Sequence, residues 1–166
     1  MPSDDTKIPT PLVSAERTVR PEWIDLNGHM NVAYYVLAFD LATEDAFSHF
    51  GLTDHYRAEH KSSTFTLELH VNYLREILEG EAFVILTTIL GVDTKRLHLF
   101  HAMHRAKPDG QAGEIVATNE NMFVHVDMEK RASSPFPDFM LTRLRAAASA
   151  HASLPRHKNI GRNIGF

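Results

Sequence analysis

The chain has 166 residues, no cysteine and a formal net charge of −4 with its histidines neutral. This length suits one domain with a core of its own. The hydrophobic fraction of 43% and the charged fraction of 23% are those of an ordinary globular protein. The weakly negative charge argues against nucleic acid as a partner, and the lack of cysteine excludes a disulfide framework, a thiol nucleophile and a thiolate metal site. With no basic cluster and no apolar stretch near the ~20 residues of a membrane helix, we expect a cytoplasmic protein without membrane contact.

The first elements in chain order are a tail, a strand and a long helix. Residues 1–15 contain three prolines and no hydrophobic periodicity, which predicts a flexible tail. The segment RTVRPEWI (17–24) is predicted as a strand. Apolar residues then recur at helical spacing over 32–50, with Asn31 as the N-cap and Gly51 as the C-terminal stop. At 1.5 Å per residue this helix spans about 30 Å, the width of a small domain, so it is predicted to be the central helix.

The pattern then changes to period two, which is typical of strands. After a loop over 54–63, strands are predicted over 64–76, 82–92, 95–106 and 113–127, and a short amphipathic helix over 136–154. In the first of these strands, one face is predicted to carry Phe65, Leu67, Leu69, Val71 and Tyr73, and the other Thr64, Thr66, Glu68, His70 and Asn72. The close succession of strands favours an antiparallel meander. One apolar sheet face with a single long helix to cover it, and exposed sheet edges, favour a homodimer or a larger homo-oligomer.

The turn DLNGHMN (25–31), which opens the long helix, carries the strongest candidate for chemistry. One interpretation is that Asp25 or Asn31 only caps the helix. Asn31 is the better placed of the two, which leaves Asp25 without a structural role. Gly28 lets the backbone turn and lets a ligand approach. A carboxylate beside the free amides of a helix N-terminus suits acyl transfer, because the amides can hold an oxyanion while the carboxylate attacks a carbonyl or takes a proton from water.

The segment RPEWIDLNGHMNVAYYVLAFD (20–40) and the order of elements over 17–127 resemble the hotdog-fold acyl-CoA thioesterases of the 4-hydroxybenzoyl-CoA thioesterase-like family. The motif that carries the resemblance is Asp25, Gly28, His29, Asn31 and Tyr35. The resemblance implies an α+β hotdog fold over 16–127, in which an antiparallel sheet wraps around one long helix, followed by a C-terminal helix and tail over 128–166. It also implies hydrolysis of an acyl-CoA thioester, with CoA as part of the substrate and no metal or redox cofactor.

The resemblance further implies roles for residues of the turn. Asp25 corresponds to the nucleophile or general base, and the oxyanion is expected on backbone amides near His29–Val32. His29 either polarises the substrate carbonyl or hydrogen-bonds the turn. Asn31 caps the helix and orients the catalytic water. Gly28, Met30 and Val32 are expected to line the substrate site.

More narrowly, four segments are similar to the betainyl-CoA thioesterase branch associated with carnitine breakdown, over 21–40, 63–76, 93–104 and 117–127. A trimethylammonium group would need an aromatic cage or a carboxylate nearby. The expected cage residues are Trp23, Tyr34 and Tyr35, although aromatic residues around a central helix are more often core. Asp40 and Glu68 are the candidate charges.

The position of Asp40 on the edge of the helix's apolar stripe predicts partial burial, and makes it the rival catalytic carboxylate. Glu68 lies on a polar strand face, where solvation is the simpler interpretation. Thr64 is a candidate hydrogen-bonding neighbour of the thioester. The phosphates of CoA need cationic partners, for which the candidates are Arg75, Lys95 and Arg96.

The run HLFHAMH does not predict a metal site. In a strand, His101 faces away from His98 and His104, and the latter two lie roughly 20 Å apart. The chain has no P-loop, GxGxxG or GxSxG motif. The remaining alternatives to a thioesterase are a hotdog hydratase or dehydratase acting on CoA esters, and a non-catalytic acyl-CoA-binding domain.

Overall fold

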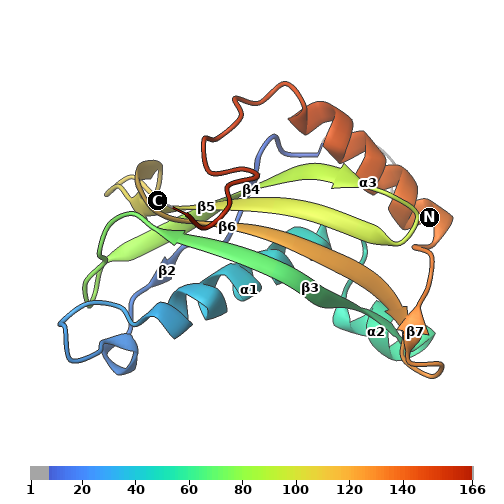
Figure 1. Ribbon diagram of the computed structural model, residues 1–166, viewed down its shortest axis with the longest axis horizontal. Coiled ribbons are helices and arrows are strands. Elements are labelled where there is room, and N and C mark those ends of the chain that lie inside the picture. The colour runs from blue at the N-terminus through green and yellow to red at the C-terminus, as the bar shows by residue number, and fades with distance from the viewer. Residues whose placement is uncertain (1–7, 166) are drawn as a thin grey trace.

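The computed structural model describes residues 8–165 and consists of one curved antiparallel sheet with helices on both of its faces (Figure 1). The helices are α1 (Val32–Ser48), α2 (Asp54–His60) and α3 (Asp138–His151), with a 3-10 helix, η1 (Pro21–Trp23). The strands are β1 (Leu12–Val13), β2 (Arg17–Thr18), β3 (Ser62–Tyr73), β4 (Ala82–Val92), β5 (Arg96–Ala106), β6 (Ala112–Asp127) and β7 (Ala132–Ser133). The predicted α+β class, the long central helix and the four long strands are confirmed.

The order of the strands differs from a simple meander. The sheet runs β1-β4-β5-β6-β3, so β3 pairs with β6 at the far edge and not with β4, its neighbour in sequence. The edge beside β4 is instead occupied by β1 and β2. The prediction of a full meander is therefore wrong for β3 and correct for β4, β5 and β6.

The N-terminal segment also departs from expectation. Residues 1–7 of the predicted tail lie outside the described residues, but Leu12 and Val13 pair with β4, and Leu12 is buried in the core. The predicted strand over 17–24 is limited to β2, because Pro21 starts η1. The predicted loop over 54–63 contains the short helix α2. Thr53 caps this helix by accepting a hydrogen bond from the Tyr56 N–H (3.2 Å).

α1 lies against the inner face of the sheet, and α3 lies against the outer face over β4 (Figure 1). The apolar stripe of α1 is buried there: Tyr35, Ala38, Phe39, Ala42, Thr43, Ala46 and Phe47. Gly51, with φ of +86°, follows the helix as predicted, although α1 ends at Ser48. None of the helices within residues 8–165 is both long and apolar enough to span a membrane.

An irregularity in β3 changes which side chains face α1. The pairing with β6 shifts register between Thr66 and Glu68, so Leu67 is an extra residue that inverts the alternation of faces beyond it. Thr66 and Leu69 both line a cavity against α1. The predicted period-two faces are therefore correct only within each half of the strand.

Candidate functional site

The turn over 25–31 is a closed backbone loop that delivers the chain into α1. The Asp25 N–H donates to the His29 carbonyl (3.1 Å), and the Gly28 N–H donates to the Asp25 carbonyl (3.0 Å). Ile24 and Met30 form an isolated antiparallel β-bridge where the chain enters and leaves the loop. Gly28 has φ of +81°, a conformation that residues with a Cβ rarely adopt. The glycine is therefore needed for the turn, as predicted.

The Asp25 carboxylate is half-buried and is held at both of its oxygens. Oδ1 accepts from the Asn27 N–H (2.8 Å), and Oδ2 accepts from Nδ2 of Asn31 (3.4 Å). The first contact is a local turn of the kind aspartates commonly form. Asp25 thus has a structural role that the sequence did not indicate. Because each carboxylate oxygen has two lone pairs, one protein donor at each leaves acceptor capacity for a substrate or a water.

The first turn of α1 leaves one backbone donor available. Asn31 caps the helix as predicted, since its Oδ1 accepts from the Ala33 N–H (3.0 Å). The Tyr34 N–H donates to the Asn31 carbonyl (3.0 Å), and the Asn31 N–H to the Trp23 carbonyl (2.9 Å). Within residues 8–165 the Val32 N–H has no acceptor. It lies where the helix dipole favours negative charge, so it is the amide best placed to hold an oxyanion.

Two cavities border this first turn. One, of about 280 Å³, is lined by His29, Met30, Val32, Tyr35, Tyr73, Leu74, Arg75 and Glu76. The other, of about 350 Å³, continues along α1 and is lined by Ala33, Val36, Leu37, Asp40, Thr66, Leu69, Asn119 and Asn121. The half-buried His29 places Nδ1 3.2 Å from the Met30 carbonyl. The start of α1 thus carries a carboxylate, a free amide and space on two sides.

The three expected cage aromatics do not surround one cavity. Trp23 and Tyr34 stack on each other with ring centroids 5.5 Å apart, and the Arg20 guanidinium lies 5.5 Å from the centroid of Trp23. Tyr35 instead packs edge-on against Tyr73 at 5.1 Å, and burial raises the pKa of its hydroxyl. The faces of Trp23 that a cation would use are already occupied within the chain.

The other candidate carboxylates lie on different faces. Asp40 is exposed in the single chain, which contradicts the predicted partial burial, and lines the larger of the two cavities at α1. Glu68 pairs opposite Met122 and lines a depression on the outer face of β3 together with the chain's last described residues. Thr64 lies at the far end of β3 from Tyr73, and the Tyr73 hydroxyl donates to the Val32 carbonyl (3.3 Å). Neither Glu68 nor Thr64 adjoins Asp25 within one chain.

The cationic candidates separate into two groups. Arg75 lines the smaller cavity beside His29, and its Nε donates to Glu114 (3.0 Å). Lys95 and Arg96 lie at the turn after β4, whereas Trp23 packs on Phe83 near the start of that strand. Arg96 pairs with Asp93 at 2.7 Å. Backbone amides of Lys95 and Arg96 lower the pKa of Asp93 to about 2. Only Arg75 therefore lies near Asp25 within one chain.

The histidines of β5 are divided between the two faces of the sheet, as the strand interpretation predicts. His101 is fully buried against α1, with Nε2 3.1 Å from the Thr43 hydroxyl and Nδ1 2.8 Å from the Thr87 hydroxyl. Burial lowers its pKa to about 3. His98 points the other way and pairs with Glu120 (2.8 Å). Within residues 8–165 no group of three potential ligands gathers around a possible metal position.

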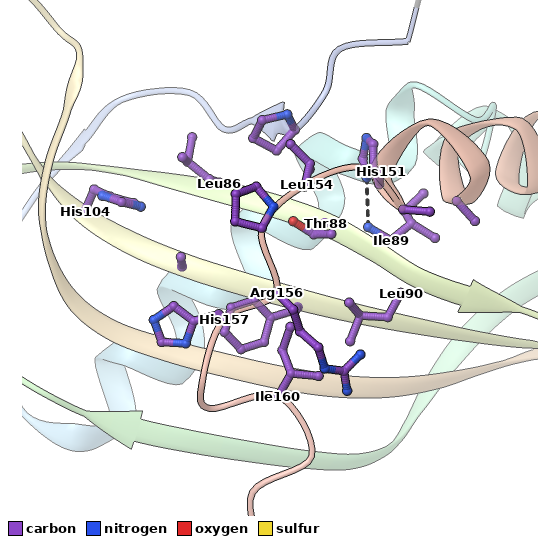
Figure 2. A pocket seen from close by; sticks show the side chains of 16 residues that line it. Leu86, Thr88, Ile89, Leu90, His104, His151, Leu154, Arg156, His157 and Ile160 are labelled. Atoms are coloured by element: carbon purple, nitrogen blue, oxygen red, sulfur yellow. Dashed lines mark hydrogen bonds between the residues drawn. The ribbon is translucent and has the colours of Figure 1, made fainter.

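A further cavity, of about 620 Å³, lies away from Asp25, on the outer face of the sheet (Figure 2). It is enclosed by β4, β5, the end of α3 and the segment that follows, with His151, Leu154, His157 and Ile160 among its lining. His151 is held there because its Nδ1 accepts from the Ile89 N–H (2.9 Å) and its Nε2 lies 3.0 Å from the Pro9 carbonyl. None of the residues predicted for the substrate site lines it.

The fold and the motif match known proteins. Residues 19–144 match the model of the thioesterase-like superfamily. The chain belongs to this family. A betainyl-CoA thioesterase of Pseudomonas aeruginosa is 40% identical over 93% of this chain and 95% of its own. An L-carnitine dehydrogenase/betainyl-CoA thioesterase of Rhizobium meliloti is 32% identical over 99% of this chain, which spans 32% of that longer protein.

A Staphylococcus aureus protein solved in complex with CoA superimposes with a TM-score of 0.85, at 28% identity, over 98% of this chain and 99% of its own. The predicted hotdog fold and the assignment as a thioesterase are confirmed by these matches. They do not identify the catalytic residues.

Two residues of the larger cavity at α1 were not predicted from the sequence. Asn119 and Asn121 lie on the inner face of β6 and are 1% and 5% exposed. The signal was present, because an amide at alternate positions of a strand with apolar neighbours places polar groups where a core is expected.

Proposed function

We propose that this thioesterase hydrolyses acyl-CoA, with betainyl-CoA as its substrate, and that Asp25 is the catalytic carboxylate. The relationship that carries the proposal is that of Asp25 to the start of α1: its carboxylate bonds the capping residue Asn31 (3.4 Å), and the next amide, that of Val32, is free. The likeness to betainyl-CoA thioesterases over nearly the whole chain supports the choice of substrate.

In the proposed reaction the thioester carbonyl oxygen accepts a hydrogen bond from the Val32 N–H. Asp25 then either attacks the carbonyl carbon, to give a mixed anhydride that water hydrolyses, or removes a proton from a water that attacks. The C–S bond breaks in either route, and CoA leaves as thiolate and takes up a proton. A thiol of the cysteine type has a pKa of ~8.5, so its thiolate leaves without a strong general acid.

We further propose that the protein acts as a homodimer or homotetramer through the edge strand β3. This edge exposes several large apolar side chains, among them Phe65 (41%), Leu67 (58%) and Leu69 (42%). Such an edge carries unpaired backbone groups, and pairing with a second copy would satisfy them. The cavity lined by Asp40 and Leu69 borders this strand, so a partner paired to the strand would enclose the cavity. Arg75, Lys95 and Arg96 are proposed to contact CoA in that assembly.

The test is free-thiol release from betainyl, hexanoyl, isobutyryl and benzoyl thioesters of CoA, with wild type and Asp25→Asn. Asparagine keeps an oxygen that can accept from the Asn27 N–H but cannot act as a base, so we expect at least a hundred-fold loss of kcat with unchanged CoA-ester binding. Asp54→Asn, an exposed helix position, is the matched control and should retain the wild-type rate. Full activity of Asp25→Asn would overturn the mechanism, whereas binding without hydrolysis in wild type would favour the non-catalytic alternative.

A further inference from the structure

The cavity on the outer face of the sheet, hereafter the outer-face cavity, is separate from the turn at Asp25. Its volume of about 620 Å³ lies within the ~300–1,000 Å³ of small-molecule sites. Its floor is the outward side of β4 and β5, where Leu86 lies opposite Ala102. One pair further along, Thr88 lies opposite Phe100. The end of α3 and the segment after it form the opposite wall (Figure 2). The proposed hydrolysis uses none of these residues, so the cavity is available to a different ligand.

Polar contacts fix the wall of the outer-face cavity to the sheet. Nδ2 of the buried Asn159 donates to the Thr118 hydroxyl (3.0 Å). The Gly161 N–H donates to Oε2 of Glu120 (2.6 Å). Both acceptors belong to β6, which lies beside the floor strand β5. Within the segment, Nδ1 of His157 accepts from the Asn159 N–H (3.1 Å). The cavity is therefore a feature of the folded chain, with a wall that hydrogen bonds hold in place.

The lining of the outer-face cavity is mostly apolar and carries positive but no negative charge. Aliphatic, proline and phenylalanine side chains make up most of it, and none of the lining residues is an aspartate or a glutamate. Arg156 is among the exposed residues of the lining, so it lies at the mouth, and it forms no ion pair within residues 8–165. Because a guanidinium keeps its charge in proteins, the mouth of the cavity stays positive.

Two histidines add hydrogen-bonding atoms to the lining. The ring of His157 lies 5.2 Å from that of Phe100, and since its Nδ1 accepts a backbone N–H, its Nε2 carries the proton and can donate. His104 places Nδ1 2.8 Å from the Gly113 carbonyl, which leaves its Nε2 without a partner among the described residues. Burial lowers the pKa of His157, and the charges of Lys158 and His104 add to the effect. One permanent cation and a neutral donor suit a single negative charge better than two.

From this arrangement we infer that the outer-face cavity binds an apolar monocarboxylate of the medium-chain fatty acid kind. The hydrocarbon chain lies on the floor against Leu86 and Phe100, where its burial drives binding. The Arg156 guanidinium pairs with the carboxylate, whose two oxygens match its parallel N–H groups, and Nε2 of His157 donates to the same group. The apolar, positive lining disfavours a cation. This site is independent of Asp25 and of the reaction proposed there.

Calorimetric titration of the full chain with decanoate, decanol and decyltrimethylammonium tests the charge separately from the hydrocarbon. We expect one decanoate per chain, bound about tenfold more tightly than decanol because of the charge-assisted pair, and no binding of the cation. Arg156→Gln should weaken the binding of decanoate about tenfold and leave that of decanol unchanged, because only this pair is lost. Ala152→Trp places an indole in the cavity from an exposed position and should abolish the binding of both.

Arg145→Gln is the matched control. Arg145 is also exposed and forms no ion pair within the described part of the chain, but it lies on α3 outside the cavity lining, so this variant should bind decanoate as wild type does. Hydrolysis of betainyl-CoA should be unchanged in all three variants, which separates a failure of this inference from a failure of the proposed function.

Three results would overturn the inference. They are no binding of decanoate up to about 1 mM, equal affinity for decanoate and decanol, and wild-type affinity for decanoate in Arg156→Gln. Tighter binding of decyl phosphate than of decanoate would also contradict it, because the site would then prefer a phosphate headgroup to a carboxylate.

Discussion

The side chain of Asn31 links Asp25 to the first turn of α1. Its Oδ1 accepts from the Ala33 N–H at 3.0 Å, and its Nδ2 faces Oδ2 of Asp25 at 3.4 Å. One amide therefore both caps the helix and orients the proposed catalytic carboxylate.

These two roles can be separated by substitution. Asn31→Ala should lose about 1 kcal/mol of the free energy of unfolding, because an uncapped N-terminus leaves a backbone donor unsatisfied. Asn31→Asp keeps a cap acceptor but replaces the donor to Asp25 with a second negative charge. Its stability in urea should equal that of wild type, while kcat falls at least tenfold. A fully active Asn31→Asp would show that the contact with Asp25 has no part in catalysis.

Gly28 provides a test of backbone strain without a steric clash. Its φ is +81°, and a Cβ added there would meet no atom within 4 Å. Gly28→Ala should therefore destabilise the protein by about 1 kcal/mol through the left-handed conformation alone, measured by urea unfolding. Gly91, which also has open space but no positive φ, is the matched control. If Gly91→Ala is as destabilising as Gly28→Ala, strain at the turn is not the cause.

The buried His101 predicts how stability depends on pH. Burial lowers its pKa to about 3, below the value of ~6.5 in an unfolded chain. Between these two values the unfolded state binds a proton that the native state does not. The contribution of His101 to the free energy of unfolding is therefore fully present above pH 6.5. Below that value it falls as the pH decreases, by about 1.4 kcal/mol per pH unit.

Urea unfolding at pH 7, 6, 5 and 4 measures this dependence, and His101→Gln should show a flatter profile than wild type. If the variant does not fold, the wild-type imidazole resonances provide the check, because His101 should stay neutral at pH 5. Protonation of His101 near pH 6.5 in the native protein would contradict the prediction.

The exposed edge of β3 predicts the oligomeric state. Leu67, the extra residue of the bulge, is 58% exposed, and Leu67→Lys should convert the proposed dimer to a monomer in sedimentation experiments. Val13→Lys changes a similarly exposed residue (54%) on the opposite edge of the sheet and should leave the dimer intact. A monomeric wild type, or dissociation by Val13→Lys, would place the interface elsewhere.

The sequence predicts best where a local pattern determines the structure. The helical period over 32–50 and the cap at Asn31 reappear as α1 because both depend on neighbouring residues. The role of Gly28 follows from the same local logic. The pairing of β3 with β6 and the bulge at Leu67 were not predictable, because they depend on a strand that lies far along the chain.

The candidate site shows the same division. The motif around Asp25 can be recognised from its residues, but the cavity on α1 is completed by Asn119 and Asn121 from β6. Trp23 and Tyr34 illustrate the opposite error: their proximity in sequence suggests a cage, whereas the rings stack on each other. Side-chain orientation between distant elements is what the sequence pattern lacks.

The position of β3 also determines the order in which the sheet is completed during synthesis. Ser62 pairs with Asp127 and Tyr73 with Ala117, so the whole of β3 is synthesised before any of its partner strand. β4 and β5, by contrast, are joined by a short turn and can pair as they emerge. The nascent chain therefore carries a strand with exposed apolar side chains and no partner until β6 follows, which leaves residues 62–73 open to misassociation with other chains and to capture by chaperones.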